Sequence, residues 1–462
     1  MAEPYDLVVI GGGPGGYTAA AHAARLGLKT ACVERRERLG GVCLNEGCIP
    51  SKALLDSSGH FAFAKGRFAE HGIRLSGVEL DLGRMLARKE EVVRDLTANV
   101  RRLLETSRVE ILHGTARLAG PQQVEVASAE GEKRLEARNV LLATGSEPAA
   151  LPHAAFDGAF IVSSTEALRF ETVPRRLGVI GGGYIGLELG SVWLRLGARV
   201  TVIEMLAGIV PAMDGQISRR LLRVLKKQGF EFRLETRVRS AAVDGEEVRV
   251  EVESGAGREV LTFDRLLVSV GRRPLTAGLG LEKLGVAADP QSGRIPVDEG
   301  WRTAVPQLYA IGDLVAGPML AHKASAEGAA VARRIAGRFG EVNYDAIPGI
   351  VYTAPEAAGV GLTEEEAKAR GIPCVIGVVP FTANGRARSA GETEGLVKVI
   401  GHARTDRLLG AHFLGPGAAE MVAEAALAIE MAASLEDIAR TVHGHPTYAE
   451  ALMEAAQAAR RE

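Results

Sequence analysis

Two cysteines five residues apart, Cys43 and Cys48, are the side chains whose types and spacing best suit redox chemistry in this sequence. They lie in segment 40–52, Gly-Gly-Val-Cys-Leu-Asn-Glu-Gly-Cys-Ile-Pro-Ser-Lys, where we expect a helix to begin. A helix N-terminus and a nearby lysine, here Lys52, both stabilise a thiolate, the reactive form of cysteine. A pair at this spacing is able to close and reopen a small disulfide, so the segment predicts a redox-active dithiol.

Two other interpretations of the cysteine pair are weaker. A structural zinc ion needs four ligands, and no second Cys-x-x-Cys motif accompanies Cys43 and Cys48, so we predict no metal site. The first expected strand begins at Asp6, which leaves no room for a signal or transit peptide and predicts a cytoplasmic protein. Structural disulfides are rare in that compartment, and redox activity is therefore favoured.

A candidate acid–base group lies near the C-terminus, in segment 443–450, His-Gly-His-Pro-Thr-Tyr-Ala-Glu. We expect this segment to open the last helix, with Pro446 in its first turn. Glu450 would then reach back to His445, and an imidazole oriented by a carboxylate is a general acid–base near neutral pH. Taken alone, His445 is better explained as a helix-capping residue, and His443 keeps that structural interpretation.

Two glycine-rich segments, 11–16 and 181–186, each follow a short apolar strand and precede a helix. In both copies a second strand follows the helix and ends about 20 residues on at an acidic residue, Glu34 or Glu204. This order is the fingerprint of a dinucleotide-binding βαβ unit, in which the helix N-terminus offers free N–H groups to a pyrophosphate. The sequence therefore predicts two nucleotide sites.

The glycines and the acid of each fingerprint have separate roles. The first glycine permits the turn, the second lets a pyrophosphate approach, and the third lets the helix pack on its strand; in order these are Gly11, Gly13 and Gly16, then Gly181, Gly183 and Gly186. A carboxylate at the strand end accepts hydrogen bonds from ribose hydroxyls and repels a 2′-phosphate. Glu204 therefore predicts NAD rather than NADP.

Length and charge place these motifs in a larger frame. The 462 residues suggest about three domains. A formal net charge of −2 lacks the excess of basic residues typical of a nucleic-acid binder, so we expect no nucleic acid as partner. No apolar run reaches the roughly 18 residues that span a bilayer, so we expect no membrane as partner. From about Asp345, short strands expected at 349–353, 374–381, 395–400 and 408–414 precede a long Ala-rich helix and a C-terminal helix. That region predicts a separate α+β domain.

Segments 41–52 and 445–450 resemble signatures of the dihydrolipoamide dehydrogenases, the E3 components of 2-oxo acid dehydrogenase complexes within the pyridine nucleotide-disulfide oxidoreductases. So do Ala143-Thr-Gly145, Gly271-Arg-Arg-Pro274, Ile311-Gly-Asp313 and Met319-Leu-Ala-His322. The resemblance spans essentially the whole chain and implies a glutathione-reductase-like α/β fold with two Rossmann-like dinucleotide-binding domains and a C-terminal α+β dimerisation domain. The implied domains are FAD-binding (1–148), NAD-binding (149–273), central and completing the FAD site (274–345), and interface (346–462).

The resemblance also implies roles for single residues. Cys43 would exchange with the substrate disulfide, and Cys48 would lie against the flavin as the charge-transfer thiolate. His445, oriented by Glu450, would act as the acid–base and would come from the opposite subunit. The remaining catalytic positions are Lys52, expected near the flavin N5, and its expected partner Glu188.

Cofactor contacts are carried over in the same way. The expected FAD contacts are Gly11, Gly13, Pro14, Gly15, Gly16, Glu34, Gly41, Val42, Lys52, Gly114, Ala116, Thr144, Gly145, Ser146, Arg273, Asp313, Met319, Leu320, Ala321 and His322. The expected NAD contacts are Gly181, Gly183, Tyr184, Ile185, Gly186, Glu188, Glu204, Val238 and Gly271. Asp313 would hold the ribityl chain. Tyr184 would either cover the nicotinamide pocket as a lid or pack its hydroxyl against a neighbouring backbone group.

The implied function is FAD-dependent oxidation of protein-bound dihydrolipoamide to lipoamide with reduction of NAD. The implied partners are a second copy of the chain and a lipoyl-bearing E2 or glycine-cleavage-type carrier protein. The alternative is NADH-dependent reduction of another low-molecular-weight disulfide, because Tyr184 stands where glutathione reductases carry tyrosine and Glu46 where the resembled family usually has an apolar residue. A docking subunit without turnover is disfavoured by the intact Cys43, Cys48 and His445.

Overall fold

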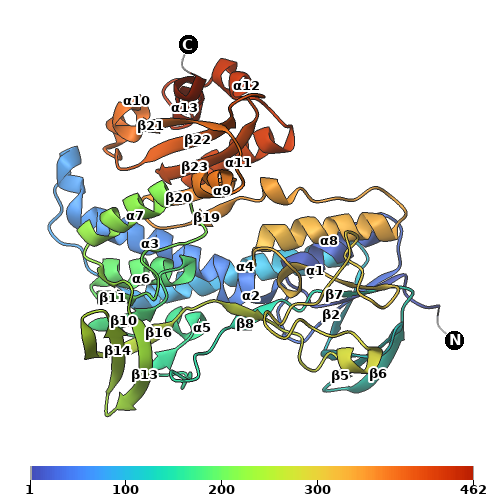
Figure 1. Cartoon of the computed structure of the whole chain (residues 1–462). Coiled ribbons are helices and arrows are strands. Elements are labelled where there is room, and N and C mark those ends of the chain that lie inside the picture. Colours follow the sequence, from blue (N-terminus) through green and yellow to red (C-terminus); the bar gives the residue numbers. More distant parts are fainter. Residues whose placement is uncertain (1–2, 461–462) are drawn as a thin grey trace. The chain divides into compact units, whose positions relative to one another are not determined.

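The computed structural model describes residues 3–460, and their contacts divide into two compact units (Figure 1). Unit 1 holds the segment ending at Leu54 together with Gly83–Ala149 and Gly271–Val342. Unit 2 holds Leu55–Leu82, Ala150–Val270 and the segment from Asn343 onward. The four predicted domains are a finer division than these two units, and their boundaries stay a prediction. Within residues 3–460, none of the helices combines the length and apolar character that a membrane crossing requires.

The core of unit 1 is a five-stranded parallel sheet with strand order β18-β7-β1-β2-β3. Its central strands are continuous apolar runs with both faces buried, as parallel sheets require. The strands are β1 (Leu7–Ile10), β2 (Thr30–Glu34), β3 (Glu110–His113), β7 (Val140–Leu142) and β18 (Leu308–Ala310). Strand β18 lies about 300 positions after β1 in the chain, so this core joins segments that are far apart in sequence.

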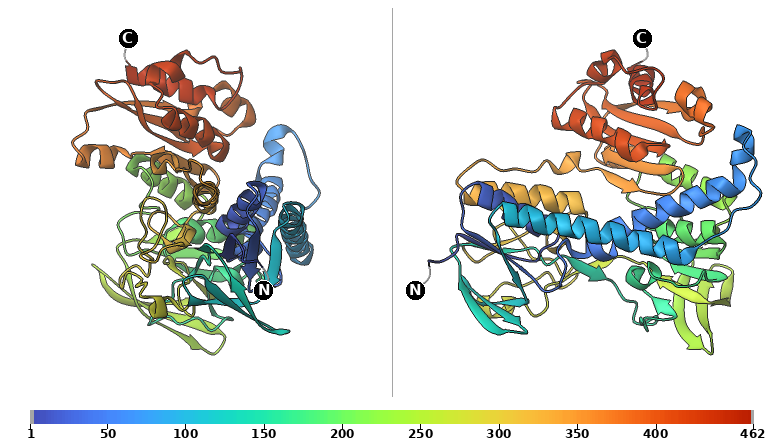
Figure 2. Two further views of the ribbon diagram at one scale, coloured as in Figure 1. Left: turned by 90° about the vertical axis from the view of Figure 1, so that its right-hand side faces the viewer. Right: turned by 180° about the vertical axis from the view of Figure 1, so that it is seen from behind.

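Helix α1 (Pro14–Arg25) connects β1 to β2, and α8 (Ala321–Ile335) lies along it (Figure 1). The two helices approach so closely that a Cβ on Gly328 would fall 2.4 Å from the carbonyl oxygen of Gly15. Five further helices belong wholly or partly to this unit, and α4 is seen as one long helix in Figure 2. They are α2 (Gly41–Glu46), α3 (Cys48–Gly66), α4 (Leu82–Thr106), η2 (Leu281–Leu284) and η3 (Gly312–Leu314).

Two antiparallel additions complete unit 1. One is the three-stranded sheet of β4 (Thr115–Gly120), β5 (Gln123–Ser128) and β6 (Gly131–Glu136). The other pairs β8 (Ser146–Pro148) with β17 (Arg272–Pro274), in the register Ser146 opposite Pro274. This short ladder brings the Gly-Arg-Arg-Pro motif back to the segment that follows β7.

Unit 2 repeats the strand–glycine loop–helix–strand plan, as predicted. The corresponding elements are β10 (Arg176–Ile180), α6 (Tyr184–Leu196) and β11 (Arg199–Ile203), which match β1, α1 and β2. One backbone hydrogen bond is also repeated: the Gly181 N–H donates to the Ile203 carbonyl at 2.9 Å, and the Gly11 N–H donates to the Val33 carbonyl at 2.8 Å. The parallel sheet has the order β12-β11-β10-β16-β9. Its other elements are β9 (Ile161–Val162), β12 (Glu231–Arg233), β16 (Arg265–Val268), α5 (Ser164–Ala167) and α7 (Gly215–Lys227). A three-stranded antiparallel sheet follows, with β13 (Arg237–Asp244), β14 (Glu247–Ser254) and β15 (Gly257–Phe263). The segment 55–82 adds η1 (Phe68–His71).

The C-terminal part of unit 2 is the predicted α+β region, built on an antiparallel sheet of order β19-β20-β23-β22-β21. The four predicted strands are present as β19 (Gly349–Val351), β21 (Cys374–Pro380), β22 (Leu396–His402) and β23 (Leu408–Gly415). A fifth, β20 (Glu356–Gly361), was not predicted, because its Ala- and Gly-rich sequence lacks β-branched alternation. The helices are η4 (Tyr344–Ala346), α9 (Glu364–Ala369), η5 (Phe381–Ala383), α10 (Gly385–Ala390), α11 (Ala418–Glu430), α12 (Leu435–Arg440) and α13 (Glu450–Arg460).

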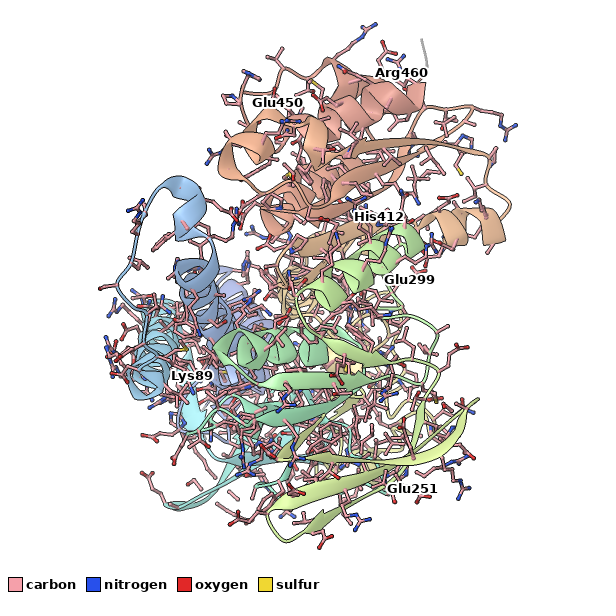
Figure 3. The ribbon with its side chains drawn as sticks, turned by 90° about the vertical axis from the view of Figure 1, so that its left-hand side faces the viewer. Lys89, Glu251, Glu299, His412, Glu450 and Arg460 are labelled. Carbon is pink, nitrogen blue, oxygen red and sulfur yellow. The ribbon has the colours of Figure 1, made fainter. Side chains whose placement is uncertain are left out.

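A buried ion pair joins α7 to this sheet within unit 2. Asp214 caps α7 by accepting the N–H of Gln216 at 2.9 Å, and its other oxygen accepts from Lys398 Nζ at 2.8 Å. Lys398 lies on β22 directly opposite His412 of β23, which Figure 3 labels. The side chains of Asp214 and Lys398 are 0% and 1% exposed. Lys398 also donates to Glu364 at 2.7 Å, so the ammonium is bonded to two carboxylates.

Replacing Lys398 by Met leaves the buried carboxylate of Asp214 without its cation, and breaking a buried pair in this way costs about 3–5 kcal/mol. We expect the free energy of unfolding, measured by urea denaturation, to fall by about that amount. The matched control is Lys368→Met, which removes the exposed partner of Glu364 and should cost less than about 1 kcal/mol. Equal losses for the two variants would contradict a stabilising role for the buried pair.

Candidate functional site

The cysteine pair spans the junction between two helices of unit 1. Cys43 lies half-buried in α2, and Cys48 is exposed at the first position of α3. Both are thiols, and they are hydrogen-bonded to each other. That bond and burial raise the pKa of Cys43, while the charge of Lys52 opposes the shift. The predicted dithiol at a helix start is therefore present, with Lys52 close enough to act on it.

Glu46, between the two cysteines, has a structural partner. Its carboxylate forms an ion pair with Arg36 at 2.9 Å, and the backbone N–H of Arg36 donates to Glu34 at 2.9 Å. Arg36 follows β2, so the ion pair ties the redox segment to the strand end of the first nucleotide fingerprint. Glu46 therefore has a structural role within unit 1, because its ion pair holds the redox segment against the end of β2.

Each glycine loop is held by the acid that its fingerprint supplies. Glu34, 6% exposed, accepts the N–H of Gly12 at 2.8 Å. In the second copy Glu204 accepts the N–H of Gly182 at 2.7 Å, and its other oxygen accepts that of Leu206 at 2.8 Å. Carboxylate oxygens carry two lone pairs each, so both acids keep acceptor capacity for a ribose hydroxyl.

The space around the second glycine of each fingerprint shows whether these loops fit a dinucleotide. Gly13 and Gly183 have extended backbones, with φ of −76° and −82°, so no backbone strain requires glycine there. A Cβ on Gly183 would meet no protein atom within 4 Å, and one on Gly13 only the Cα of Gly41 at 3.7 Å. Neither conformation nor packing accounts for glycine at these positions. Close approach of a ligand at the N-termini of α1 and α6 does, so the loops fit bound dinucleotides.

Asp313 sits in a hydrogen-bond chain that the sequence indicated only in part. The hydroxyl of Ser146 donates to its carboxylate, and Arg272 donates from Nε to the Ser146 hydroxyl oxygen at 2.7 Å. Burial lowers the pKa of Arg272, and the charges of Asp313 and Cys48 oppose that shift. The structure thus links Arg272 to Asp313 through Ser146, whereas the predicted Arg273 bonds Glu147 at 2.7 Å. Strand alternation separates the two arginines but does not say which one faces inward.

Other predicted FAD positions lie in the loop after β7, at the start of α8 and in the core strand β4. Thr144 donates to the carbonyl of Leu275 at 2.7 Å, and Gly145 has φ +75°. Met319 and Leu320 directly precede α8, and Ala321 and His322 are its first two residues. The side chain of Ala116 lies in the hydrophobic core of unit 1, as that of Val238 does in unit 2. Any contact of these two residues with a cofactor must therefore come from the backbone.

The acid–base candidates meet as predicted, but outside a helix. His445 Nδ1 lies 2.8 Å from Glu450, whose other oxygen accepts the N–H of Thr447 at 2.7 Å. The prediction that His445 and Pro446 open the last helix is wrong: α13 begins at Glu450, which Figure 3 labels, because the first backbone turn bonds are those that Ala451 and Leu452 donate to the carbonyls of Tyr448 and Ala449. The N–H of Thr447 and the hydrogen bond with His445 lower the pKa of Glu450, so this carboxylate is ionised at neutral pH.

Two neighbours of this segment complete the description. Asn384, 2% exposed, donates its amide to the Thr447 carbonyl at 2.9 Å and was not predicted, because no motif marks it. His443 bonds Glu424 at 2.8 Å with its side chain 6% exposed, which agrees with its structural interpretation.

The predicted nicotinamide-side residues lie on α6. Tyr184 is its first residue, and burial raises the pKa of the phenol. A Cβ on Gly349 would come within 3.3 Å of the Tyr184 hydroxyl, so the glycine leaves room for it. Glu188, 5% exposed, accepts the N–H of Tyr352 at 3.0 Å. Pairing of Lys52 with Glu188 would join the two units and stays a prediction.

The chain contains two dinucleotide fingerprints with the same plan, and a dithiol follows the first of them. Its C-terminal α+β region carries a histidine oriented by a carboxylate. These features together define a dinucleotide-dependent disulfide oxidoreductase. Residues 5–328 match the family model of the pyridine nucleotide-disulphide oxidoreductases, and residues 347–456 match that family's dimerisation domain. The chain belongs to the pyridine nucleotide-disulphide oxidoreductase family, whose members bind FAD and NAD or NADP.

Known proteins narrow the class. The chain is 48% identical to a mitochondrial dihydrolipoyl dehydrogenase of Pisum sativum, over 99% of this chain and 92% of that protein. It is 49% identical to the mitochondrial dihydrolipoyl dehydrogenase of Homo sapiens, over 98% and 90%. The crystal structure of LpdA from Mycobacterium tuberculosis superposes with a TM-score of 0.90 at 26% identity, covering 98% of this chain and 99% of that one. The predicted family and fold are confirmed.

The open space beside Gly183 yields a prediction. Gly183→Ala should fold normally, with a melting temperature within about 2 °C of the unmodified protein, because its Cβ meets nothing. The added methyl should obstruct the pyrophosphate and raise the KM for the nicotinamide dinucleotide by about tenfold or more. The contrasting variant is Gly186→Ala, whose Cβ would lie 2.4 Å from the Gly181 oxygen and should destabilise the fold. An unchanged KM for Gly183→Ala would place the dinucleotide elsewhere.

The raised pKa of Cys43 yields a second prediction. In the reduced protein this thiol should be mostly uncharged at neutral pH, and only the thiolate reacts with iodoacetamide. Alkylation of Cys43, followed by mass spectrometry, should therefore accelerate as the pH rises past the ordinary thiol range near about 8.5. Lys52→Met removes a charge that lowers this pKa and should slow alkylation at fixed pH. A rate that is already maximal near neutral pH would contradict the shift.

Proposed function

We propose that this protein oxidises dihydrolipoamide to lipoamide and reduces NAD to NADH, with FAD as the carrier between them. The observation that carries the proposal is the Cys43–Cys48 thiol pair, hydrogen-bonded at the α2–α3 junction of the unit that holds the first fingerprint. The Pisum sativum and Homo sapiens relatives, at 48% and 49% identity, are dihydrolipoyl dehydrogenases, and they support this substrate over other disulfides.

The cysteine pair acts by thiol–disulfide exchange. A thiolate of dihydrolipoamide attacks the Cys43 sulfur of the oxidised pair, forming a mixed disulfide and releasing Cys48 as a thiolate. The second substrate thiolate attacks the substrate sulfur of that mixed disulfide, so that lipoamide closes and Cys43 is released. Two electrons have then moved from substrate to protein. Because the bond with Cys48 and burial raise its pKa, Cys43 favours the protonated state after release.

The substrate thiols must lose protons, and we assign their acceptance to His445. A carboxylate only accepts, so the Nδ1 bond to Glu450 is donated by the imidazole and leaves Nε2 as the basic nitrogen of the neutral ring. The side chain of His445 is 78% exposed, so it is accessible to a group on another protein molecule. We assign it to the cysteine pair of a second copy of the chain.

Bound FAD would supply a two-electron acceptor for the reduced cysteine pair and a donor for the nicotinamide. We assign its pyrophosphate to the loop 11–16 at the N-terminus of α1 and its adenosine ribose to Glu34. Asp313, held by Ser146, is assigned to the ribityl chain. The charged neighbour Arg272 keeps this group of polar side chains in place.

The second fingerprint is assigned to NAD rather than NADP. Glu204 stands directly after β11, and no basic residue occupies positions 205–208, Met-Leu-Ala-Gly. A carboxylate there bonds ribose hydroxyls and repels a 2′-phosphate. Among partners, we propose a homodimer through the region 347–456 and a lipoyl-bearing carrier protein, with the cytoplasm as location.

Cys43→Ser tests the central assignment. A serine hydroxyl cannot exchange with a disulfide, so dihydrolipoamide-dependent NAD reduction should fall by at least about a thousandfold while the flavin absorbance is retained. Cys374→Ser, on the edge strand β21, is the matched control and should keep full turnover. Glutathione disulfide with NADH, assayed in parallel on the unmodified protein, examines the alternative substrate class. Near-normal turnover by Cys43→Ser would overturn the assignment.

Glu204→Arg tests the nicotinamide preference. Replacing the carboxylate by a guanidinium removes the ribose acceptor and supplies a partner for a 2′-phosphate. The ratio of kcat/KM for NAD over NADP should fall by about tenfold or more. Glu246→Arg, in the exposed turn between β13 and β14, makes the same charge change away from the loop and should leave the ratio unchanged. A ratio that does not move in Glu204→Arg would assign selection to other residues.

A further inference from the structure

Helix α8 contains an ion pair that is completely withdrawn from solvent. Lys323 and Glu327 stand one turn apart, their charged atoms are 3.1 Å apart, and both side chains are 0% exposed. Withdrawing two charges from water is costly, and a buried pair of this kind is in general no more stabilising than apolar residues of similar size. The burial of this pair is therefore weak evidence that it serves stability, and its contacts indicate what it holds.

Both charged groups bind the same residue of another segment. Lys323 Nζ donates to the carbonyl of Gly312 at 2.9 Å, and Glu327 accepts the N–H of Gly312 at 2.7 Å. Gly312 has φ +69°, and a Cβ there would lie 3.1 Å from that of Ala324, so conformation and packing both require glycine. The backbone of this residue is thus held from both sides, immediately before Asp313.

The same helix also contacts the first glycine loop of unit 1. Ser325 donates to the carbonyl of Pro14 at 3.3 Å, and a Cβ on Gly15 would lie 3.1 Å from the carbonyl oxygen of Ala324. Figure 1 shows α8 lying along α1. Two loops that are about 300 residues apart in the chain are therefore aligned by one helix, which reaches the first through small residues and the second through its ion pair.

We propose that Lys323 and Glu327 are positioning residues for FAD, which hold Gly312–Asp313 in the conformation that the cofactor binds. The proposal rests on the assignment of Asp313 to the FAD site made above. The pair touches the loop backbone and contributes no side chain to the cofactor. Its loss should weaken FAD binding and speed FAD release, whatever substrate the protein oxidises.

Two double variants separate charge from hydrogen bonding without leaving an unpaired buried charge. Lys323→Met with Glu327→Leu removes both charges and both bonds to Gly312, and Lys323→Met with Glu327→Gln keeps an amide oxygen for the Gly312 N–H. FAD release from the holoprotein is followed by the rise in flavin fluorescence. We expect the dissociation constant for FAD to rise at least about tenfold in Met/Leu and at least about threefold in Met/Gln.

The matched control is Lys398→Met with Asp214→Asn, which neutralises the buried pair of unit 2 and should leave FAD release unchanged. FAD affinity within twofold of the unmodified protein in the folded Met/Leu variant would overturn the proposal. If Met/Leu does not fold, Met/Gln decides by the same criterion, because it keeps one bond to Gly312. Asp313→Ala is measured alongside. Unchanged FAD affinity in Asp313→Ala would refute the assignment of Asp313 to the FAD site. Weakened affinity in Asp313→Ala, together with tight binding in the double variants, would refute only the role of the ion pair.

Discussion

Both nucleotide folds depend on a backbone contact that excludes every side chain. A Cβ on Gly16 would lie 1.8 Å from the carbonyl oxygen of Gly11, and a Cβ on Gly186 would lie 2.4 Å from that of Gly181. Helices α1 and α6 therefore begin directly against the turn that ends their strands. This contact aims the free N–H groups of each helix over the end of its sheet, which is where an anion is best stabilised. The acids Glu34 and Glu204 then hold the loops from the neighbouring strands.

Around these rigid loops, charged groups are placed where they hold backbone segments. Glu34, Glu204 and Glu450 each accept at least one backbone N–H within a segment of the site. The ion pair of Glu46 with Arg36 extends this pattern to the redox segment. A carboxylate bonded to backbone N–H groups makes charge-assisted hydrogen bonds, which are stronger than neutral ones. Carboxylates thus hold the backbone of these segments in place.

Much of this architecture was predictable from the sequence because its signals are local. The βαβ fingerprints, the dithiol at a helix start and the His445–Glu450 pair all lie within short segments, and each is present. Strand β20 was missed because its stability comes from neighbours on both sides and not from its own residues. The start of α13 was misplaced because the two bonds that Glu450 accepts, from His445 and from Thr447, fit a loop before the helix as well as a first helical turn.

Residues that act through distant partners left no local signal. Arg272 and Arg273 are adjacent in one motif, and only the register of β17 with β8 determines that the first reaches Ser146. Asn384 and Thr447 meet across 63 positions, and Lys323 reaches Gly312 through a change of chain direction. Spacing in the sequence does not encode such contacts, so they emerge only from the folded structure.

The discontinuous build of unit 1 has a consequence for how the chain is made. Strand β18 and helix α8, which complete the sheet and cover α1, are translated about 300 residues after β1. At roughly 5–20 residues per second, the first βαβ segment waits about 15–60 s on the ribosome before its partners emerge. During that interval the apolar edge of β7, which β18 later covers, is without its neighbour. All strands of the parallel sheet of unit 2, from β9 to β16, are translated before β18, so this second nucleotide fold is able to complete its sheet before the first one does.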